Sequence, residues 1–573
     1  MKLFFIITSL VLGLNAASQC EKYWVFFTDK DGVEFNPHEF FDEKAIERRE
    51  KLGLDLYDLT DYPVKTDYLL GVSALADSTC NHSRWFNSVA VMAYPNQIKK
   101  IKALPFVKNT EPFPKNQMSL AEIKDGDDYV GIKERKILEI QTQRMGARAF
   151  SSNKINGKGI RIAVLDAGFR ATDTHGMFHH IRSRNGILKT YDFIKNDENV
   201  YGFDNHGTAV LSCIAGVYRD EFTLLKDTFG LATEAEFLLA RTEKRIIEVF
   251  SEEENWLAAV EWADKNGADI INSSLGYGGQ RYSYKDMNGT QTLVSRAGNL
   301  AAKKGILVVN SAGNEGNGRW NFINAPADAD SVLAVGGIHP FSGIQTPFSS
   351  VGPTFNNKFK PNVTAIAHVM AAQDDYIVET QGTSFSSPLV AGFAACVWQV
   401  NSDWNNMELF KALENGSDLY PYHDYAHGFG VPKAENFIGH LIDSLPTKIP
   451  EVVLDSLLDS DSLIITNSIQ ELDTTFMFSI ESGELKFTII QPSSIERTVS
   501  NFWAFDIDNE ELKAAVDYED YLFIHFRDKT GHITHYQVID MLGAEEVFVD
   551  IPYNTAVIMC SYEGHSQLIN YNP

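Results

Sequence analysis

The middle of the chain alternates short apolar runs with longer helical ones. The apolar runs have the length of strands and cover residues 159–165, 235–240, 268–272, 306–309 and 331–335. The helical runs cover residues 207–215, 251–265 and 292–304. Apolar strands that alternate with helices predict a parallel sheet with helices on both faces. Residues 155–443 are therefore predicted to form one α/β domain.

Residues 19–117 have a different pattern, with fewer and more separated apolar runs. Residues 23–27 and 88–94 are strand-like, residues 43–51 are a charged helical run, and Pro95 opens a second helical run at 96–104. A further strand is expected after residue 106. This β-α-β order predicts a small α+β unit. The polar stretch 118–154 that follows is predicted to be an exposed connector.

The C-terminal residues 444–573 lose the helical pattern. Strand-like runs occur at residues 462–466, 485–490, 521–526 and 546–550, with turn residues between them. This pattern predicts a β-sandwich-like region. No residue in it indicates chemistry.

The first eighteen residues have the features of a signal peptide. Met1 and Lys2 precede an apolar run that ends at Leu14, and small residues follow it up to Ser18. The run is too short to span a membrane, and no later segment is long enough. The protein is therefore expected to be secreted, periplasmic or attached to the cell surface. Lipidation at Cys20 is disfavoured because Gln19 stands where a small residue is needed.

Charge and cysteine content narrow the range of partners. The net charge of -26 argues against nucleic acid or an anionic membrane as the main partner. The five cysteines contain no C-x-x-C pair, so a thiolate metal site is not expected. Cys20 and Cys80 could form a disulfide, but the sequence does not settle their pairing.

The stretch Gln381 to Pro388, QGTSFSSP, predicts a sharp turn that leads directly into a buried helix. Gly382 permits a backbone conformation that a side chain would obstruct, and Pro388 is expected in the first helical turn. Ser384 would then lie at the helix N-terminus, where free N–H groups favour a developing negative charge. Such a position suits a nucleophile, although Ser384 could also simply cap the helix.

Three short motifs together resemble the subtilisin-like serine peptidases. GTSFSSPLVAG is similar to the nucleophile motif G-T-S-M-A-x-P-x-V-A-G of this family, NHGT around His206 to its H-G-T-H-V-A, and VLDAGF around Asp166 to its D-[ST]-G. The order Asp, His, Ser along the chain is also that of the family. The resemblance implies that Ser384 is the nucleophile, His206 the general base and Asp166 the residue that orients His206. Ala167 departs from the pattern, because a hydroxyl is missing beside the acid.

Two further segments resemble the substrate-binding parts of the same family. SAGNEG is similar to its A-G-N segment, which implies that Asn314 donates to the oxyanion. Ser274, Leu275 and Gly276 are similar to its S-L-G segment, which pairs with an extended substrate, and Gly313 is assigned to the same binding region. The glycine-rich neighbours of Asn314 suggest an open P1 pocket.

The resemblance implies a secreted bacterial serine endopeptidase that forms an acyl-enzyme and matures by cutting its own connector. Its expected partners are polypeptide substrates and its own N-terminal prodomain. No cofactor or catalytic metal is expected. A structural calcium ion is compatible with the family, but no ligand loop can be assigned. The alternative is a catalytically inactive relative that acts as a binding module, supported by Ala167 and by Asn362 in place of the family's aspartate.

Overall fold

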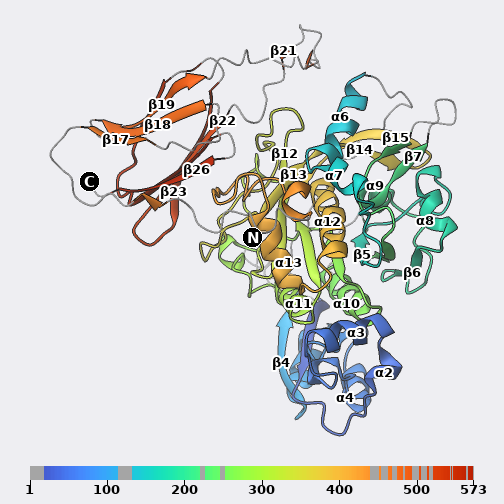
Figure 1. The fold of residues 1–573 in the computed structure, drawn as a ribbon. Coiled ribbons are helices and arrows are strands. Elements are labelled where there is room, and N and C mark those ends of the chain that lie inside the picture. Colours follow the sequence, from blue (N-terminus) through green and yellow to red (C-terminus); the bar gives the residue numbers. More distant parts are fainter. Residues whose placement is uncertain are drawn as a thin grey trace, which may run out of the picture.

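The structure is a computed structural model in which three parts of the chain can be distinguished (Figure 1). It describes residues 19–113, 132–219, 226–244, 252–279, 281–438, 451–452, 462–466, 474–481, 484–492, 503–504, 513–514, 521–541, 544, 546–562 and 565–571. The signal peptide predicted at residues 1–18 lies outside these ranges. None of the described helices combines the length and the apolar character that a membrane crossing requires.

The central part is built on a parallel sheet of seven strands in the order β13-β12-β11-β10-β5-β9-β6. The strands are β5 (Arg161–Asp166), β6 (Ile187–Asp192), β9 (Glu236–Arg241), β10 (Ile270–Ser273), β11 (Leu307–Ser311), β12 (Val332–Ile338) and β13 (Val363–Ile366). The predicted parallel α/β architecture is confirmed. The strands β6 and β13 were not among the predicted runs, because their segments carry more polar residues or stand close to proline.

Helices cover both faces of this sheet, as strand β5 demonstrates. Ile162 and Val164 belong to the apolar cluster that contains α9 (His206–Ala215) and α12 (Thr383–Val400). Ala163 and Leu165 point to the opposite face and belong to the cluster that contains α10 (Glu252–Lys265) and α11 (Leu293–Lys303). Successive residues of a strand face opposite sides, so the strand is buried on both.

The N-terminal part is a four-stranded antiparallel sheet with helices. Its strand order is β2-β3-β1-β4, with β1 (Glu21–Phe27), β2 (Ser78–Ser83), β3 (Ser88–Ala93) and β4 (Val107–Pro112). The helices are α2 (Pro37–Phe40), α3 (Glu43–Lys51), α4 (Thr66–Ser73) and α5 (Pro95–Lys102). The sequence did not predict β2, α2 or α4. Cys20 and Cys80 are both free thiols, so the disulfide left open above is not formed.

The N-terminal part packs beneath α10 and α11 (Figure 1). Its helix α3 brings Arg48 and Arg49 against Asp264 at the end of α10, and Arg49 Nη2 lies 2.6 Å from Asp264 Oδ2. Beside them Lys304 Nζ lies 2.8 Å from Asp61 Oδ1. These side chains are buried. The contact between the two parts is therefore a buried ionic network.

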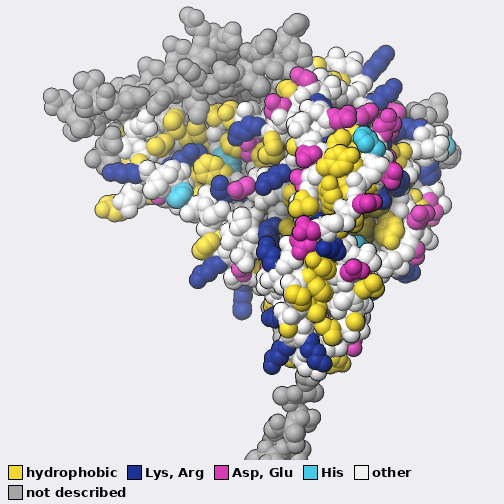
Figure 2. Space-filling model, turned by 90° about the horizontal axis from the view of Figure 1, so that it is seen from below, with side chains coloured by type: hydrophobic (Ala, Val, Ile, Leu, Met, Phe, Trp, Pro, Cys, Tyr) yellow, Lys and Arg dark blue, Asp and Glu magenta, His cyan; other side chains and the backbone are white. Residues whose placement is uncertain are grey.

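Seen from below, the molecule does not present a surface of one charge. Figure 2 shows acidic and basic side chains interspersed over that face, with hydrophobic side chains between them. The net charge of -26 is thus not concentrated there.

The connector predicted at residues 118–154 is helical in its second half. Helices α6 (Ile132–Gln143) and α7 (Ala147–Ser152) occupy it, and Ile137, Gln141 and Met145 are buried. Gln141 Nε2 donates to Phe229 O and Met370 O, at 2.8 and 3.1 Å. The expectation of an exposed connector is therefore wrong for residues 132–148. The apolar residues of α6 recur at helical spacing among many charged ones, which hid the pattern.

The C-terminal part contains two larger sheets of mainly antiparallel strands, in the orders β16-β26-β25-β22-β23 and β17-β18-β19-β24. The strands are β16 (Glu451–Val452), β17 (Ser462–Thr466), β18 (Thr474–Glu481), β19 (Glu484–Pro492), β22 (Tyr521–Arg527), β23 (Ile533–Asp540), β24 (Glu546–Asp550), β25 (Val557–Tyr562) and β26 (His565–Asn570). All four predicted strands are present. Tyr422 and Phe523 pack across the boundary with the central part.

Candidate active site

The helix α12 begins where the sequence placed the turn. It follows strand β15 (Tyr376–Gln381), and Gly382 is its N-cap residue with φ of 144°. This backbone conformation is strained for any residue with a side chain, so glycine is required. Ser384 is consequently the second residue of the helix, and it is buried with 4% of its surface exposed.

Pro388 is not in the first helical turn, as the sequence suggested, but inside the helix. A proline at this position cannot donate to the carbonyl four residues earlier, which is that of Ser384. This carbonyl instead accepts a hydrogen bond of 2.7 Å from Ser274 Oγ. The Ser384 hydroxyl itself donates to Ser274 O at 3.4 Å. The expected nucleophile is therefore held against the segment that follows β10.

Asp166 and His206 are 40 positions apart in the chain and are in direct contact. Asp166 ends strand β5, His206 begins helix α9, and His206 Nδ1 lies 2.7 Å from Asp166 Oδ1. Since the carboxylate can only accept, the hydrogen of this bond belongs to Nδ1. The close approach of the two elements depends on Gly207, where a Cβ atom would lie 2.4 Å from Gly168 O.

The ring of His206 also faces the start of α12. Its centroid lies 5.6 Å from that of Phe385, the residue after Ser384. Asp166 and His206 thus lie in contact at the carboxyl edge of the sheet, where ligand sites of parallel sheets are found, and the ring of His206 faces the residue that follows Ser384.

Ala167 has a visible consequence for Asp166. The Ala167 N–H donates to Asp166 Oδ1 at 2.7 Å, but within the described part of the chain Asp166 Oδ2 has no hydrogen-bond partner. Asp166 is completely buried. The side chain of Ala167, next to this carboxylate, has no hydroxyl to donate to it.

Asn314 follows strand β11 and its side chain is oriented by Thr383. Asn314 Oδ1 accepts from Thr383 N at 2.9 Å and from Thr383 Oγ1 at 3.0 Å. Because a backbone N–H can only donate, the amide oxygen must face Thr383. The amide nitrogen is then directed away from Thr383, and it lies 3.5 Å from the place where a Cβ atom on Gly382 would stand.

Ser274, Leu275, Gly276 and Gly313 lie on two neighbouring segments, one after β10 and the other after β11. Asn310 Nδ2 donates to Leu275 O at 2.9 Å and ties the two segments together. Gly313 has φ of 120° and its N–H donates to Thr383 Oγ1 at 3.3 Å. The segments and the start of α12 therefore form one continuous edge.

Sequence reasoning missed Asn324 and Trp320, which lie behind these segments. Trp320 Nε1 donates to Asn324 Oδ1 at 2.7 Å, and Asn324 Nδ2 donates to Glu315 Oε2 at 2.9 Å. Burial raises the pKa of the Glu315 carboxyl. No motif marks Asn324 in the sequence, so only its contacts reveal it. The Asn324 side chain lies between the two segments, close to Gly276 and Gly278 on one side and to Gly313 on the other.

The side chain of His175, which lies two residues after Asp173 in the loop that follows β5, has local partners. His175 Nδ1 accepts from Met177 N at 3.0 Å, and His175 Nε2 lies 3.2 Å from Tyr376 O. Among the described residues, no three histidine, cysteine, aspartate or glutamate side chains gather in a way that could hold a metal ion.

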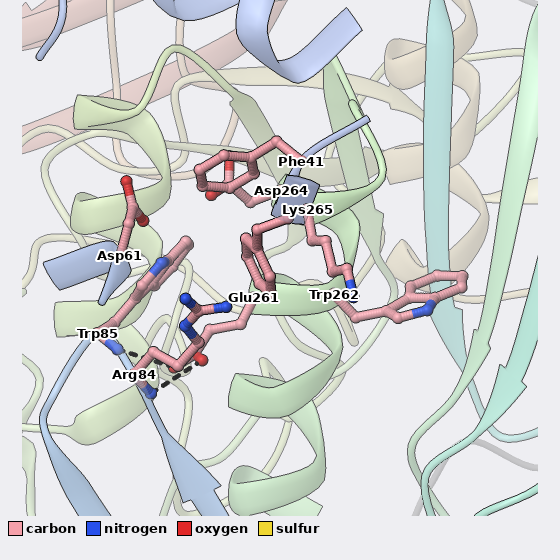
Figure 3. A pocket seen from close by; sticks show the side chains of 9 residues that line it. Phe41, Asp61, Arg84, Trp85, Glu261, Trp262, Asp264 and Lys265 are labelled. Carbon is pink, nitrogen blue, oxygen red and sulfur yellow. Dashed lines mark hydrogen bonds between the residues drawn. The ribbon is translucent and has the colours of Figure 1, made fainter. Parts of the chain in front are cut away.

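A cavity of about 130 Å³ lies elsewhere, between the N-terminal part and α10 (Figure 3). Its lining comes from both parts and consists of Phe40, Phe41, Asp61, Arg84, Trp85, Glu261, Trp262, Asp264 and Lys265. Glu261 accepts hydrogen bonds from the backbone N–H groups of Arg84 and Trp85, at 3.1 and 3.3 Å. This cavity belongs to the contact between the two parts and not to the edge that carries Ser384.

Comparison with known proteins gives two family matches. Residues 157–431 match the model described as the subtilase family. Residues 22–126 match a peptidase S8 propeptide domain of Bacteroidota. The two matches cover the central and N-terminal parts of the structure.

Individual relatives are distant. The thermophilic serine proteinase of Bacillus sp. (strain AK1) is 30% identical over 260 residues, which cover 45% of this chain and 57% of the relative. Subtilisin NAT of Bacillus subtilis subsp. natto is 25% identical over 351 residues, which cover 61% of this chain and 80% of the relative. A solved cold-adapted subtilisin-like serine proteinase shares 22% identity, with a TM-score of 0.38 over 49% of this chain and 88% of the other.

Proposed function

Through residues 157–431 this chain belongs to the subtilase family, the subtilisin-like serine peptidases, and we propose that it cleaves peptide bonds with a Ser384-His206-Asp166 triad. The observation that carries the proposal is the 2.7 Å contact between His206 Nδ1 and Asp166 Oδ1, next to the start of the helix that bears Ser384. Subtilases need no cofactor for catalysis.

In the proposed reaction, Ser384 Oγ attacks the carbonyl carbon of the scissile bond. His206 takes the hydroxyl proton on Nε2, because its Nδ1 hydrogen is held by Asp166. His206 then gives the proton to the leaving amine, and an acyl-enzyme on Ser384 remains. Water, activated by the same imidazole, hydrolyses the ester and restores the free serine.

The negative charge on the carbonyl oxygen is proposed to be held by two donors. One is the N–H of Ser384 at the start of α12, where helix N–H groups have no partner inside the helix. The other is Asn314 Nδ2, which is directed away from Thr383 because the amide oxygen binds there. An amide donates without competing with His206 for the proton.

Labelling with a fluorophosphonate tests the triad directly. The wild-type chain should become labelled on Ser384, whereas Ser384→Ala and His206→Ala should not. Ser387→Ala is the matched control, since Ser387 lies one turn further along the same helix and its hydroxyl contacts Asn272 Oδ1 at 2.9 Å. Equal labelling of wild type and Ser384→Ala would assign the nucleophile elsewhere.

An inactive binding protein is the second candidate. The observation in its favour is the unpartnered Asp166 Oδ2 beside Ala167. A folded wild-type chain that neither labels nor cleaves casein, but does both after Ala167→Ser, would support this alternative.

The propeptide match and the predicted signal peptide further support a secreted precursor that processes itself. The cut is proposed within residues 114–131, because α6 and α7 pack against the central part after this stretch. Intact-mass spectrometry of wild type and Ser384→Ala, both expressed in a host without other extracellular peptidases, provides the test. Identical N-termini in the two would exclude self-processing.

A further inference from the structure

The side chain that precedes the scissile bond, P1, has a defined place if the proposed function holds. In the proposed acyl-enzyme, the backbone carbonyl carbon of the P1 residue is bonded to Ser384 Oγ, and the carbonyl oxygen faces Asn314. Ser384 lies against Ser274 through the 2.7 Å bond, and Thr383 lies against Asn314. The P1 side chain must therefore enter between the segment after β10 and the segment after β11.

Asn324 already occupies the space between these two segments. A Cβ atom built on Gly276 would lie 3.0 Å from Asn324 Cβ, and one on Gly278 would lie 2.1 Å from Asn324 Oδ1. On the other segment, a Cβ atom on Gly313 would lie 2.7 Å from Asn324 Nδ2. Asn324 thus touches both walls at once, and only 1% of its surface is exposed.

The position of Asn324 is fixed at its backbone and at its side chain. Its N–H donates to Ala312 O at 3.1 Å, and the next residue, Ala325, pairs with Tyr277 in an antiparallel bridge. Its amide binds Trp320 Nε1 at one end and Glu315 Oε2 at the other. A large P1 side chain could enter only by breaking these buried hydrogen bonds, which is unfavourable.

Trp320 closes the space behind Asn324. A Cβ atom on Gly279 would lie 2.5 Å from an atom of the indole ring, so the ring lies directly over this glycine. The ring also makes an edge contact with Phe322, with centroids 5.8 Å apart. The indole is thus in contact with Gly279, Phe322 and Asn324.

We infer that Asn324, backed by Trp320, sets the P1 specificity of this peptidase and restricts it to small residues such as glycine, alanine and serine. A small P1 side chain does not reach the space between the two segments that Asn324 fills. A phenylalanine at P1 would have to displace a buried amide whose partners would then be unsatisfied, and sites of this kind discriminate strongly.

Glu315 raises the question of a cationic P1 residue. Its Oε2 atom accepts from Asn314 N and Asn324 Nδ2, both at 2.9 Å, and from Ser350 Oγ at 3.3 Å. The carboxylate is therefore engaged in holding Asn314 and Asn324 in place. A preference for lysine at P1 would contradict the inference.

The experiment uses internally quenched peptides that differ only at P1, with Ala, Ser, Lys or Phe. The mature enzyme is first titrated with a fluorophosphonate, so that rates refer to active sites. We expect kcat/KM to be at least tenfold higher for Ala and Ser than for Phe and Lys. Absence of labelling would contradict the proposed function, whereas labelled enzyme that prefers Phe or Lys would overturn only this inference.

Two variants connect the preference to the named residues. Asn324→Gly should raise the Phe-to-Ala ratio of kcat/KM by at least tenfold, because it opens the space between the segments. Trp320→Phe removes the 2.7 Å bond to Asn324 Oδ1 but keeps an aromatic ring, and should raise the ratio by a smaller factor. The second variant remains informative if the first does not fold. An unchanged ratio in the labelled variants would overturn the inference.

Discussion

Ser274 Oγ donates a 2.7 Å hydrogen bond to the backbone carbonyl of Ser384, 110 positions later in the chain. The carbonyl is available because Pro388, four residues further along α12, has no N–H. A proline inside a helix normally leaves an unsatisfied acceptor. Here that acceptor fastens the proposed nucleophile to the proposed substrate-binding segment.

Ser274→Ala should therefore impair catalysis as well as folding. The Ser384 carbonyl would be buried without its donor, a cost of about 1–3 kcal/mol. Relaxation of the first turn of α12 would misplace the Ser384 hydroxyl, and we expect kcat/KM to fall about tenfold or more, equivalent to about 1.4 kcal/mol in the barrier. Steady-state kinetics and urea unfolding measure the two effects.

Ser386→Ala is the matched control for that variant. Ser386 lies on the same helix, and its hydroxyl donates to Ile366 O at 3.1 Å. Its loss should lower stability by a similar amount but leave kcat/KM near the wild-type value. Equal losses of activity in both variants would contradict a special role for Ser274.

Asn314→Ala should lower kcat with little change in KM. The amide would stabilise charge that exists only in the transition state, so its removal should not weaken substrate binding. We expect a loss of about 10²–10³ in kcat, the magnitude known for the corresponding donor of subtilisin itself. Single-turnover kinetics would isolate the chemical step, and a near-normal rate would exclude Asn314 from the oxyanion site.

The sequence was sufficient for five of the seven strands of the central sheet, because apolar strands and helices with clear ends alternate there. It also located the glycine turn before Ser384, since Gly382 requires a φ that other residues avoid. It misplaced Pro388, because the donor that compensates for this proline is far away in the chain. Such a contact has no local signal.

The sequence also could not locate Asn324. Its role depends on two segments that meet only in the folded sheet, and an asparagine in a loop has no distinctive pattern. The helices of the connector were missed for another reason. Ile137, Gln141 and Met145 are buried by contact with the central part, while the charged residues between them dominated the composition.

Asp264→Asn tests the ionic contact beneath α10. Asp264 binds Arg49 Nη2 at 2.6 Å and also contacts Arg48, and all three side chains are buried. Arg49 keeps its 3.3 Å contact with Asp61, but Arg48 loses its acidic partner, and breaking a buried pair in this way typically costs about 3–5 kcal/mol. We expect the free energy of unfolding, measured in urea, to fall by this amount when Asp264→Asn is introduced into the Ser384→Ala chain, in which the N-terminal part stays attached.

The exposed pair of Lys358 and Asp330 provides the comparison. Their charged atoms lie 3.6 Å apart, and about half of each side chain is exposed. Lys358→Ala should cost less than about 1 kcal/mol, because such pairs are screened by solvent. If Asp264→Asn lowered the free energy of unfolding by as little as Lys358→Ala, the buried network would not hold the two parts together.

Glu261 should make the stability of the precursor depend on pH. Burial raises the pKa of its carboxyl to about 7, although hydrogen bonds from Ser83 Oγ and the N–H groups of Arg84 and Trp85 act in the opposite direction. An unfolded glutamate ionises near pH 4.3. Between about pH 4.3 and 7 the folded state thus holds more protons than the unfolded state, so stability should fall as pH rises through this window.

The slope from one such group is at most about 1.4 kcal/mol per pH unit, and it should vanish above about pH 7. The measurement is urea unfolding of Ser384→Ala at half-unit steps from pH 4 to 8, compared with the same chain carrying Glu261→Gln. The amide cannot ionise, so the difference between the two free energies of unfolding should change with pH only between about pH 4.3 and 7. Glu50→Gln replaces an exposed glutamate of α3 and should leave the pH dependence of Ser384→Ala unchanged. A constant difference between the Ser384→Ala and Glu261→Gln curves across the whole range would show that Glu261 does not titrate at this contact.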